Sequence, residues 1–293
     1  MERTRQTTEF QKSPSIFQMF LKKLFRNKLA IIGCVIVAIM LFVAIFADFI
    51  RPYDPNEMNI VDSLLKPGEK GHLLGTDNYG RDVLSRLIDG TGISIIVGLG
   101  AVGVGGVIGV LLGLIAGFFG GWLDSLIMRL MDAMSAFPFI LLAITLMMVF
   151  GSGLQNTIMA IGIANVPGFV RMTRGQVLSV KEEEYIEVTR SLGASKWRIL
   201  FDHILPNCIT PIIVYGTMSV AGAIISEAAL SYLGLGIQPP QASWGNILQE
   251  GKDYLVIAPH IAVSSGLAIV VAVLGINLFG DALRDASDPR NID

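Results

Sequence analysis

The stretch EEEYIEVTRSLGASKWRILFDHILPN, residues 182–207, is the most charged run of the chain and lies between two long apolar segments. Of the 293 residues, 52% are hydrophobic, only 16% are charged and 32 are glycines. This composition is too apolar for a soluble domain, and its glycine content is typical of closely packed transmembrane helices. We therefore predict one all-α polytopic membrane protein. The net charge of −2 argues against nucleic acid as a partner.

Six segments are long and apolar enough to cross a bilayer, which needs about twenty such residues. They cover residues 29–48, 93–117, 134–152, 155–172, 208–230 and 259–280. The first segment is too long, and follows too long a leader, to be a cleaved signal peptide, so we expect it to remain as an anchor.

The lysines and arginines set the orientation, because cytoplasmic loops carry an excess of them. They are concentrated in the N-terminal leader and around the charged run, at Arg3, Arg5, Lys12, Lys22, Lys23, Arg26, Lys28, Arg171, Arg174, Lys181, Arg190, Lys196 and Arg198. We predict that both termini and the charged run are cytoplasmic, and that residues 51–91 and 231–258 are outside. A cysteine introduced at Asp62 or Ser243 should then be reachable from outside, whereas one at Lys196 should not.

Glycines follow a regular pattern in the second apolar segment. Gly98, Gly100 and Gly103 spell GxGxxG, but no strand precedes them and lipid would surround them, so a dinucleotide site is excluded. Further glycines recur every four residues, at Gly105, Gly109, Gly113, Gly117 and Gly121. This stripe predicts a helix face that another backbone approaches closely.

The chain carries no signature of an energy source of its own. It has no Walker A pattern for ATP and no HExxH motif, and its histidines lie in loops or at the edges of spans. The ionisable residues of the apolar regions cluster near span ends, at Asp48, Asp124, Arg129, Asp132 and Glu227, which argues against a proton relay. If the protein transports a solute, a partner must therefore supply the energy. Cys34 and Cys208 fall in different spans, and we expect both to be free thiols.

The charged run itself predicts two short helices. Residues 186–192 form the first, Gly193 and Ala194 break it, Ser195 caps the second, and Pro206 ends the unit. In the second helix Trp197, Leu200 and Phe201 share one face. This apolar face either contacts another protein or lies on lipid headgroups, and the spacing alone does not choose between the two.

The spacing of Glu187, Gly193, Leu205 and Pro206 resembles the EAA loop of permease subunits in binding-protein-dependent ABC importers. Val188 and Thr189 replace two alanines of that motif and His203 replaces an isoleucine, and these variants resemble the peptide-permease branch. Three more stretches resemble the C-type subunits of dipeptide and oligopeptide permeases. They are HLLGTDNYGRDVLSRL (72–87), LSYLGLGIQPPQASWG (230–245) and GDALRDASDP (280–289).

This resemblance implies a type I ABC importer permease fold with six transmembrane helices in the bacterial inner membrane. It implies a translocation subunit for dipeptides or oligopeptides that works with a second permease, two ATP-binding subunits and an extracytoplasmic solute-binding protein. The partner ATPases would use ATP and Mg²⁺, and this chain would be no enzyme and would hold no cofactor or metal. Glutathione or nickel complexes remain alternative cargoes. An ATP-independent channel or carrier, or a membrane scaffold, remains an alternative of another class.

On this basis we divide the chain into a cytoplasmic tail (1–28), a first transmembrane helix with an extracytoplasmic segment (29–92), a core permease domain (93–280) and a cytoplasmic tail (281–293). The core contains a cytoplasmic coupling loop at 173–207. The resemblance suggests that this loop contacts the ATPases through Glu187, Gly193, Ala194, Ser195, Trp197, Leu205 and Pro206.

Two further patterns concern the substrate path and the external segment. Small or polar residues recur on one face of the fifth span, at Tyr215, Ser219, Gly222 and Ser226. They line either the substrate path or a helix contact within the subunit. Residues 83–88 predict an interfacial helix with polar Arg81, Asp82, Ser85 and Arg86 beside it, and Trp244 predicts an aromatic anchor at the membrane surface.

Overall fold

The computed structural model describes residues 27–287, so residues 1–26 of the predicted N-terminal tail and 288–293 of the C-terminal tail lie outside the described part. Within it the secondary structure is helical, with no β-strand. The helices are α2 (Lys28–Ile45), α3 (Ala47–Ile50), α4 (Val83–Phe119), α5 (Gly121–Ser135), α6 (Phe139–Phe150), α7 (Leu154–Lys181), α8 (Glu184–Ser191), α9 (Lys196–Arg198), α10 (Leu205–Tyr232), α11 (Trp244–Gly251) and α12 (Pro259–Ser287). The predicted all-α class is confirmed.

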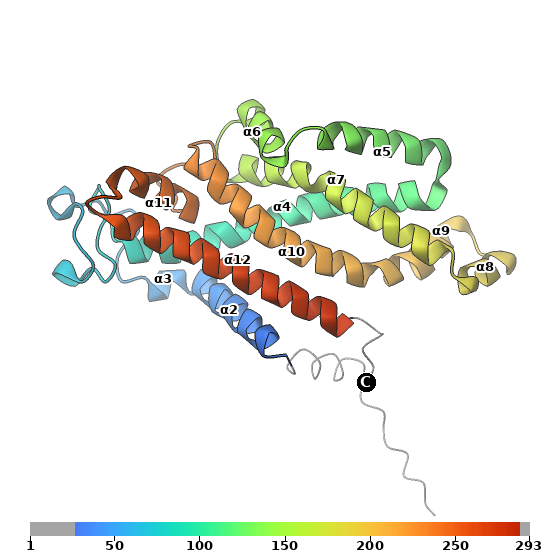
Figure 1. The fold of residues 1–293 in the computed structure, drawn as a ribbon, viewed down its shortest axis with the longest axis horizontal. Coiled ribbons are helices and arrows are strands. Elements are labelled where there is room, and N and C mark those ends of the chain that lie inside the picture. Colours follow the sequence, from blue (N-terminus) through green and yellow to red (C-terminus); the bar gives the residue numbers. More distant parts are fainter. Residues whose placement is uncertain (1–26, 288–293) are drawn as a thin grey trace, which may run out of the picture.

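The long helices lie side by side and give the molecule two distinct ends (Figure 1). The loops between α3 and α4 form one end, together with α11, whereas α8 and α9 form the other. Four helical segments are long and apolar enough to span a membrane: Lys28–Ile45, Val83–Phe119, Lys196–Tyr232 and Pro259–Ser287. A fifth span is possible if α5 and α6, which are bent by 90° at their junction, count as one.

The predicted third and fourth spans differ from the structure in an informative way. Residues 134–152 do not form one straight helix, because α5 ends at Ser135 and α6 has only 12 residues. A helix of that length reaches about 18 Å, too short to cross a bilayer alone. Residues 155–172, the predicted fourth span, lie within α7, which continues through Arg174 to Lys181 and is not one of the segments apolar enough to span a membrane.

Helix α4 begins ten residues before the predicted span, at Val83, because Asp82 caps it by accepting a hydrogen bond from the Ser85 backbone nitrogen at 2.7 Å. The predicted separate interfacial helix over residues 83–88 is therefore wrong. These residues form the first turns of α4, and Arg86 is almost completely buried.

Buried charges hold together the end that contains α11 and the loops before α4. Arg81 donates to Asp77 at 2.6 Å and to Glu250 at 2.7 Å, and Arg86 approaches the same Glu250 oxygen at 3.3 Å. Both arginines have only 1% of their side chains exposed. The network therefore joins the segment before α4 to α11, although the sequence pattern suggested polar groups facing water.

Helix α11 packs inside the subunit and does not lie on the membrane surface. Ser243 and Asn246 form a capping box at its start, and both residues are buried. The Trp244 indole donates to the Leu87 carbonyl at 3.1 Å and is 3% exposed. The predicted surface anchor is wrong, because an indole with a carbonyl partner is as stable inside the protein as at an interface.

The glycine stripe of α4 packs against α7 as predicted. A Cβ built on Gly113 would lie 2.7 Å from the Thr173 Cβ, and one on Gly117 would lie 2.8 Å from the Val177 Cβ. Only glycine permits this approach of the two helices. Gly121 does not belong to the stripe, because it starts α5 after a turn at Gly120.

Pro206 does not end the helical unit, contrary to the prediction. The helix continues from Lys196 to Tyr232, with a π-helical segment, η3 (Ile199–Ile204), between α9 and α10. Pro206 lies in the first turn of α10, directly after the π-helical segment, whose wider turns depart from the regular α-helical hydrogen-bond pattern.

Candidate functional site

The region between α7 and α10 has the local structure that the charged run predicts. Helix α8 ends just before Gly193, whose φ of +84° favours glycine, and the Ser195 hydroxyl accepts a hydrogen bond from the Arg198 nitrogen at 3.3 Å. A Cβ on Gly193 would meet nothing within 4 Å, so the backbone angle alone requires glycine here. Residues 173–181 of the predicted loop are the last turns of α7.

The inner face of this region packs onto the ends of the long helices. Ile186, Ile199, Leu200 and Ile204 are buried in one cluster, with Ala194 and Leu205 partly buried against it. The cluster also contains residues of α4 and α7, namely Leu114, Phe118 and Val177. We predicted that Leu200 shares an exposed face with Trp197 and Phe201. This prediction is wrong for Leu200, because the subunit itself covers it.

The outer face is apolar and exposed. It consists of Val188, Leu192, Trp197 and Phe201, of which Leu192 is 83% exposed and Trp197 is 59% exposed. We call these four residues the outer patch. Glu187 and the acidic residues at 182–184 are exposed nearby in the sequence. The outer patch lies at the end of the molecule opposite the loops that precede α4 (Figure 1).

Direct contacts connect this region to α4 and α10, and another contact joins the neighbouring end of α7 to α4. The Trp197 ring meets Phe119 of α4 edge to face at 5.7 Å and stacks on Phe201 at 5.9 Å. Lys181 donates to the Phe118 carbonyl at 2.8 Å, and Asn207 of α10 donates to the Tyr185 hydroxyl at 3.1 Å. Burial raises the pKa of that hydroxyl, so it stays protonated.

The predicted path residues of α10 do not form one continuous polar wall. The hydroxyls of Ser219 and Ser226 donate to carbonyls of their own helix, at 2.8 Å and 2.7 Å, and Ser226 is buried. Gly222 is exposed, with nothing within 4 Å of a built Cβ. Tyr215 packs edge to face on Phe169 at 4.9 Å and lines a polar pocket.

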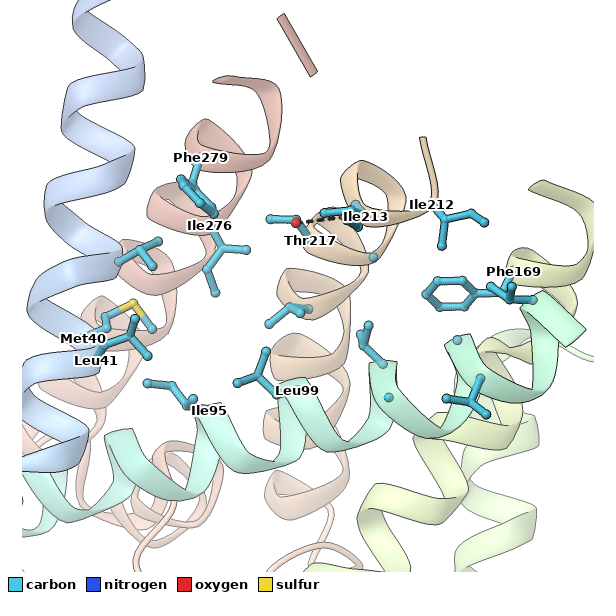
Figure 2. Close-up of a pocket in the computed structure, with 18 of the residues that line it drawn as sticks. Met40, Leu41, Ile95, Leu99, Phe169, Ile212, Ile213, Thr217, Ile276 and Phe279 are labelled. Atoms are coloured by element: carbon cyan, nitrogen blue, oxygen red, sulfur yellow. Dashed lines mark hydrogen bonds between the residues drawn. The ribbon is translucent and has the colours of Figure 1, made fainter. Parts of the chain in front are cut away.

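Two kinds of cavity flank α10. On one side, an apolar groove of about 720 Å³ is bounded by α2, α4, α7, α10 and α12. Figure 2 shows apolar side chains converging on it, with Met40 and Leu41 from α2, Ile95 and Leu99 from α4, and Phe279 from α12. On the other side lie two pockets, of about 360 Å³ and 590 Å³, whose linings combine polar and apolar side chains.

Two arginines of α7, named above only as cations that set the orientation, bind acidic residues of α5, and this pairing was not predicted. Arg174 holds Asp124 of α5 through two hydrogen bonds, of 2.6 Å and 2.7 Å. Arg171 donates to Asp132 and to Ser135 of α5, both at 2.9 Å. The acidic residues of α5 and the arginines of α7 could have indicated these ion pairs. That inference would have required knowing that α7 extends beyond the predicted span.

The buried carboxylate of Glu227 joins two helices near the other end of α10. It accepts hydrogen bonds from Ser231 at 2.8 Å and from Ser94 of α4 at 3.5 Å, and it is completely buried. Its position near a span end agrees with the prediction, but its burial among hydroxyl donors does not follow from the sequence alone.

A bundle of long apolar helices defines the class of polytopic membrane proteins. Residues 109–293 match the family of binding-protein-dependent transport system inner membrane components, and residues 15–67 match the N-terminal TM domain of oligopeptide transport permease C. The first match covers more than half of the chain, so this protein belongs to the family of binding-protein-dependent transport system inner membrane components. The predicted resemblance is confirmed, and the protein is a multi-pass permease subunit.

Relatives of known name are similar over nearly their whole length. The glutathione transport system permease protein GsiD of Pectobacterium atrosepticum is 44% identical, covering 92% of this chain and 90% of the relative. The di/tripeptide transport system permease protein DppC of Pseudomonas aeruginosa is 44% identical, covering 94% and 93%. The dipeptide transport system permease protein DppC of Alkalihalophilus pseudofirmus is 44% identical, covering 92% and 88%.

A solved structure supports the fold. An inward-facing conformation of the MetNI methionine ABC transporter superimposes with a TM-score of 0.59 and 20% sequence identity. The match covers 70% of this chain and 98% of that one. The protein therefore has the type I ABC importer permease fold, as predicted.

Proposed function

We propose that this protein is the translocation subunit of an ATP-driven importer of dipeptides and other short peptides. Two ATP-binding subunits, using ATP and Mg²⁺, would supply the energy, a second permease would complete the passage, and an extracytoplasmic binding protein would deliver the peptide. Both termini would be cytoplasmic. The relatives named as dipeptide and di/tripeptide permeases support this cargo, since their identity extends over almost the whole chain.

The observation that carries the proposal is the outer patch of Val188, Leu192, Trp197 and Phe201. An apolar surface of this kind is covered by a partner protein when it protrudes from the membrane end of a subunit. Behind its exposed residues lies a buried cluster that includes residues of α4 and α7. A displacement of the outer patch would therefore be transmitted to both helices. These features support a role as the docking and coupling surface for an ATPase subunit.

The proposed coupling follows from the contacts of this region. Movement of α8 and α9 would pass through Trp197 and Phe119 to α4, and through the continuous helix Lys196–Tyr232 into α10. Glu187 would offer a charged contact and the outer patch an apolar one. Gly193 would set the angle between α8 and α9, so that both contacts face the same partner.

The test uses the purified whole transporter carrying Gly193→Val or Glu187→Ala. We expect Gly193→Val to strain the turn by about 1–3 kcal/mol and to reduce both ATPase retention and peptide-stimulated hydrolysis. Glu187→Ala should weaken ATPase retention while the permease still reaches the membrane. Gly193→Asn is the matched control, because asparagine tolerates this backbone angle and should preserve coupling. Full ATPase binding and full coupled hydrolysis in both test variants would contradict the proposal and leave the loop as a lipid-surface anchor.

Glutathione is a second candidate cargo, because relatives named as glutathione permeases are 44% to 46% identical over 92% of this chain. Uptake of labelled glutathione and of labelled dialanine by cells with and without the gene distinguishes the two. A nickel complex would instead require metal-dependent uptake. Uptake that persists without the ATP-binding subunits would indicate the alternative class of an ATP-independent channel or carrier.

A further inference from the structure

A polar pocket of about 360 Å³ lies where the chain bends between α5 and α6. Its lining combines a cation, an amide and a phenol, from Arg171 and Asn165 of α7 and Tyr215 of α10. Ser135 of α5 also lines it and accepts a hydrogen bond from Arg171. These side chains come from three helices, so the pocket exists only in the folded subunit.

Arg171 lies deep along the bundle. It is ten residues from the end of α7 at Lys181, or about 15 Å of helix, whereas a bilayer core is about 30 Å thick. Lys181 itself bonds to Phe118 at the end of α4, so the ends of α7 and α4 are level. The neighbouring residues Phe169 and Thr173 pack on Gly109 and Gly113 of α4, within a stretch of α4 that has no charged residue.

The ion pair of Arg171 with Asp132 is exposed at the surface of the subunit. Their side chains are 43% and 65% exposed, with 2.9 Å between the paired atoms. Charged side chains at such a depth face a bundle interior or a water-filled cavity, because exposure to lipid is costly. The exposed ion pair therefore supports an aqueous space on this face of the subunit.

A second pocket, with mostly apolar lining and several polar side chains, lies nearer the start of α10. Tyr215 also lines the second pocket, of about 590 Å³, together with Gln176, Asn207, Thr210 and Arg284. The apolar groove of Figure 2 uses the opposite face of α10, with Ile213, Gly216 and Val220. The face of α10 turned toward these two pockets therefore carries polar groups that its opposite face largely lacks.

We propose that Arg171 forms a carboxylate-binding site on the translocation route, which takes the free carboxylate of a short peptide during its passage. This inference rests on the proposed function. Among the described residues, the hydrogen bonds of Arg171 all use Nη2, so its Nη1 and Nε groups are open to a second acceptor. Guanidinium and carboxylate form strong, charge-assisted hydrogen bonds.

The neighbouring groups suit the rest of a peptide. The Asn165 amide nitrogen donates to the Ile161 carbonyl at 3.0 Å, which leaves the amide oxygen to accept from a peptide N–H. The Tyr215 hydroxyl can donate to a peptide carbonyl. Asp132 balances the charge of Arg171, so the carboxylate is held weakly enough to leave, as transport requires. Recognition of the main-chain terminus would be independent of the peptide's side chains.

The test is thiol labelling of the whole transporter in inside-out membrane vesicles, with Asn165→Cys in a chain that carries Cys34→Ala and Cys208→Ala. An anionic sulfonate reagent and a cationic trimethylammonium reagent are compared. Arg171→Gln should lower the ratio of anionic to cationic labelling rates about fivefold, as expected for the loss of one nearby charge. Arg171→Lys should keep the ratio. Arg129→Gln, the matched control, removes an exposed cation of α5 that does not line the pocket and should also keep it.

Peptide protection supplies an independent measurement in the Asn165→Cys transporter itself. Millimolar dialanine should slow the anionic labelling, whereas C-terminally amidated dialanine should not. Absence of labelling by either reagent, an unchanged ratio in Arg171→Gln, or equal protection by both peptides would overturn the inference. If Arg171→Gln fails to assemble, peptide protection decides. If these tests fail while Gly193→Val still uncouples the ATPase, only the proposed carboxylate site is disproved. The proposed function then still stands.

Discussion

Gly113 shows how much of this subunit's packing depends on single missing methyl groups. A Cβ at this position would lie 2.7 Å from the Thr173 Cβ and 2.8 Å from the Val170 carbonyl oxygen, so α4 and α7 would have to separate. We expect Gly113→Ala to lower the free energy of unfolding by about 1–3 kcal/mol, the usual cost of overpacking. The thermal unfolding midpoint of the solubilised protein measures this.

Gly103→Ala on the same helix is the matched control, because nothing lies within 4 Å of a Cβ built there. It should leave the midpoint unchanged or raise it slightly, since alanine is a better helix former. Equal midpoints for the two alanine variants would show that the contact between α4 and α7 relaxes without cost.

At the scale of elements, the α8–α9 region has an inner and an outer face with different tasks. Trp197→Leu removes the ring contacts to Phe119 and Phe201 but keeps an apolar side chain in the outer patch. We expect ATPase subunits to remain bound, while peptide transported per ATP hydrolysed falls about two- to tenfold, since each aromatic pair contributes about 0.5–1.5 kcal/mol. Transport and hydrolysis are measured together in proteoliposomes.

Leu192→Ala is the complementary variant, because Leu192 is 83% exposed and belongs only to the outer face. It should weaken ATPase binding about fivefold or more, as expected when a leucine loses its buried area in an interface. Transport per ATP in the complexes that still form should be normal. If Trp197→Leu releases the ATPases and Leu192→Ala does not, the assignment of the two faces is reversed.

At the scale of the whole molecule, Glu250 connects parts of the chain that are far apart in sequence. Its carboxylate is the shared partner of the buried Arg81 and Arg86. Glu250→Gln would leave two buried cations undercompensated, and we expect a loss of about 3–5 kcal/mol in the free energy of unfolding. Glu57→Gln, at an exposed position of the same end, is the control and should be neutral. Equal yields of folded protein for both variants would contradict a structural role of the network.

The orientation in the membrane is a second prediction at this scale. Single cysteines at Val61 and Val256, which are 87% and 96% exposed, should react with a membrane-impermeant thiol reagent in intact cells, and one at Leu192 should not. Ser243 is unsuitable as a probe, because it is completely buried in the capping box of α11. Labelling of a Leu192 cysteine from outside would reverse the proposed topology.

The sequence alone determined the features that depend on neighbouring residues or on helical periodicity. The long apolar segments predict the α-helical membrane fold, and the glycines from Gly105 to Gly117 predict the close contact that α4 makes with α7. Gly193 and Ser195 predict the break and the cap of the charged run. Each of these features follows from the preferences of a residue for a backbone angle, a cap or a helix face, so no distant partner is needed to recognise it.

Only the tertiary structure decided which side of each helix is covered. Periodicity identifies residues that share a face, but it does not tell whether lipid, water or the same chain lies against it. For this reason Leu200 and Trp244 were expected at surfaces and are buried. Likewise, the pairing of Arg171 with Asp132 of α5 could not be read from the sequence. Arg86 can be buried because Glu250, distant in sequence, supplies the opposite charge, and only folding brings such partners together.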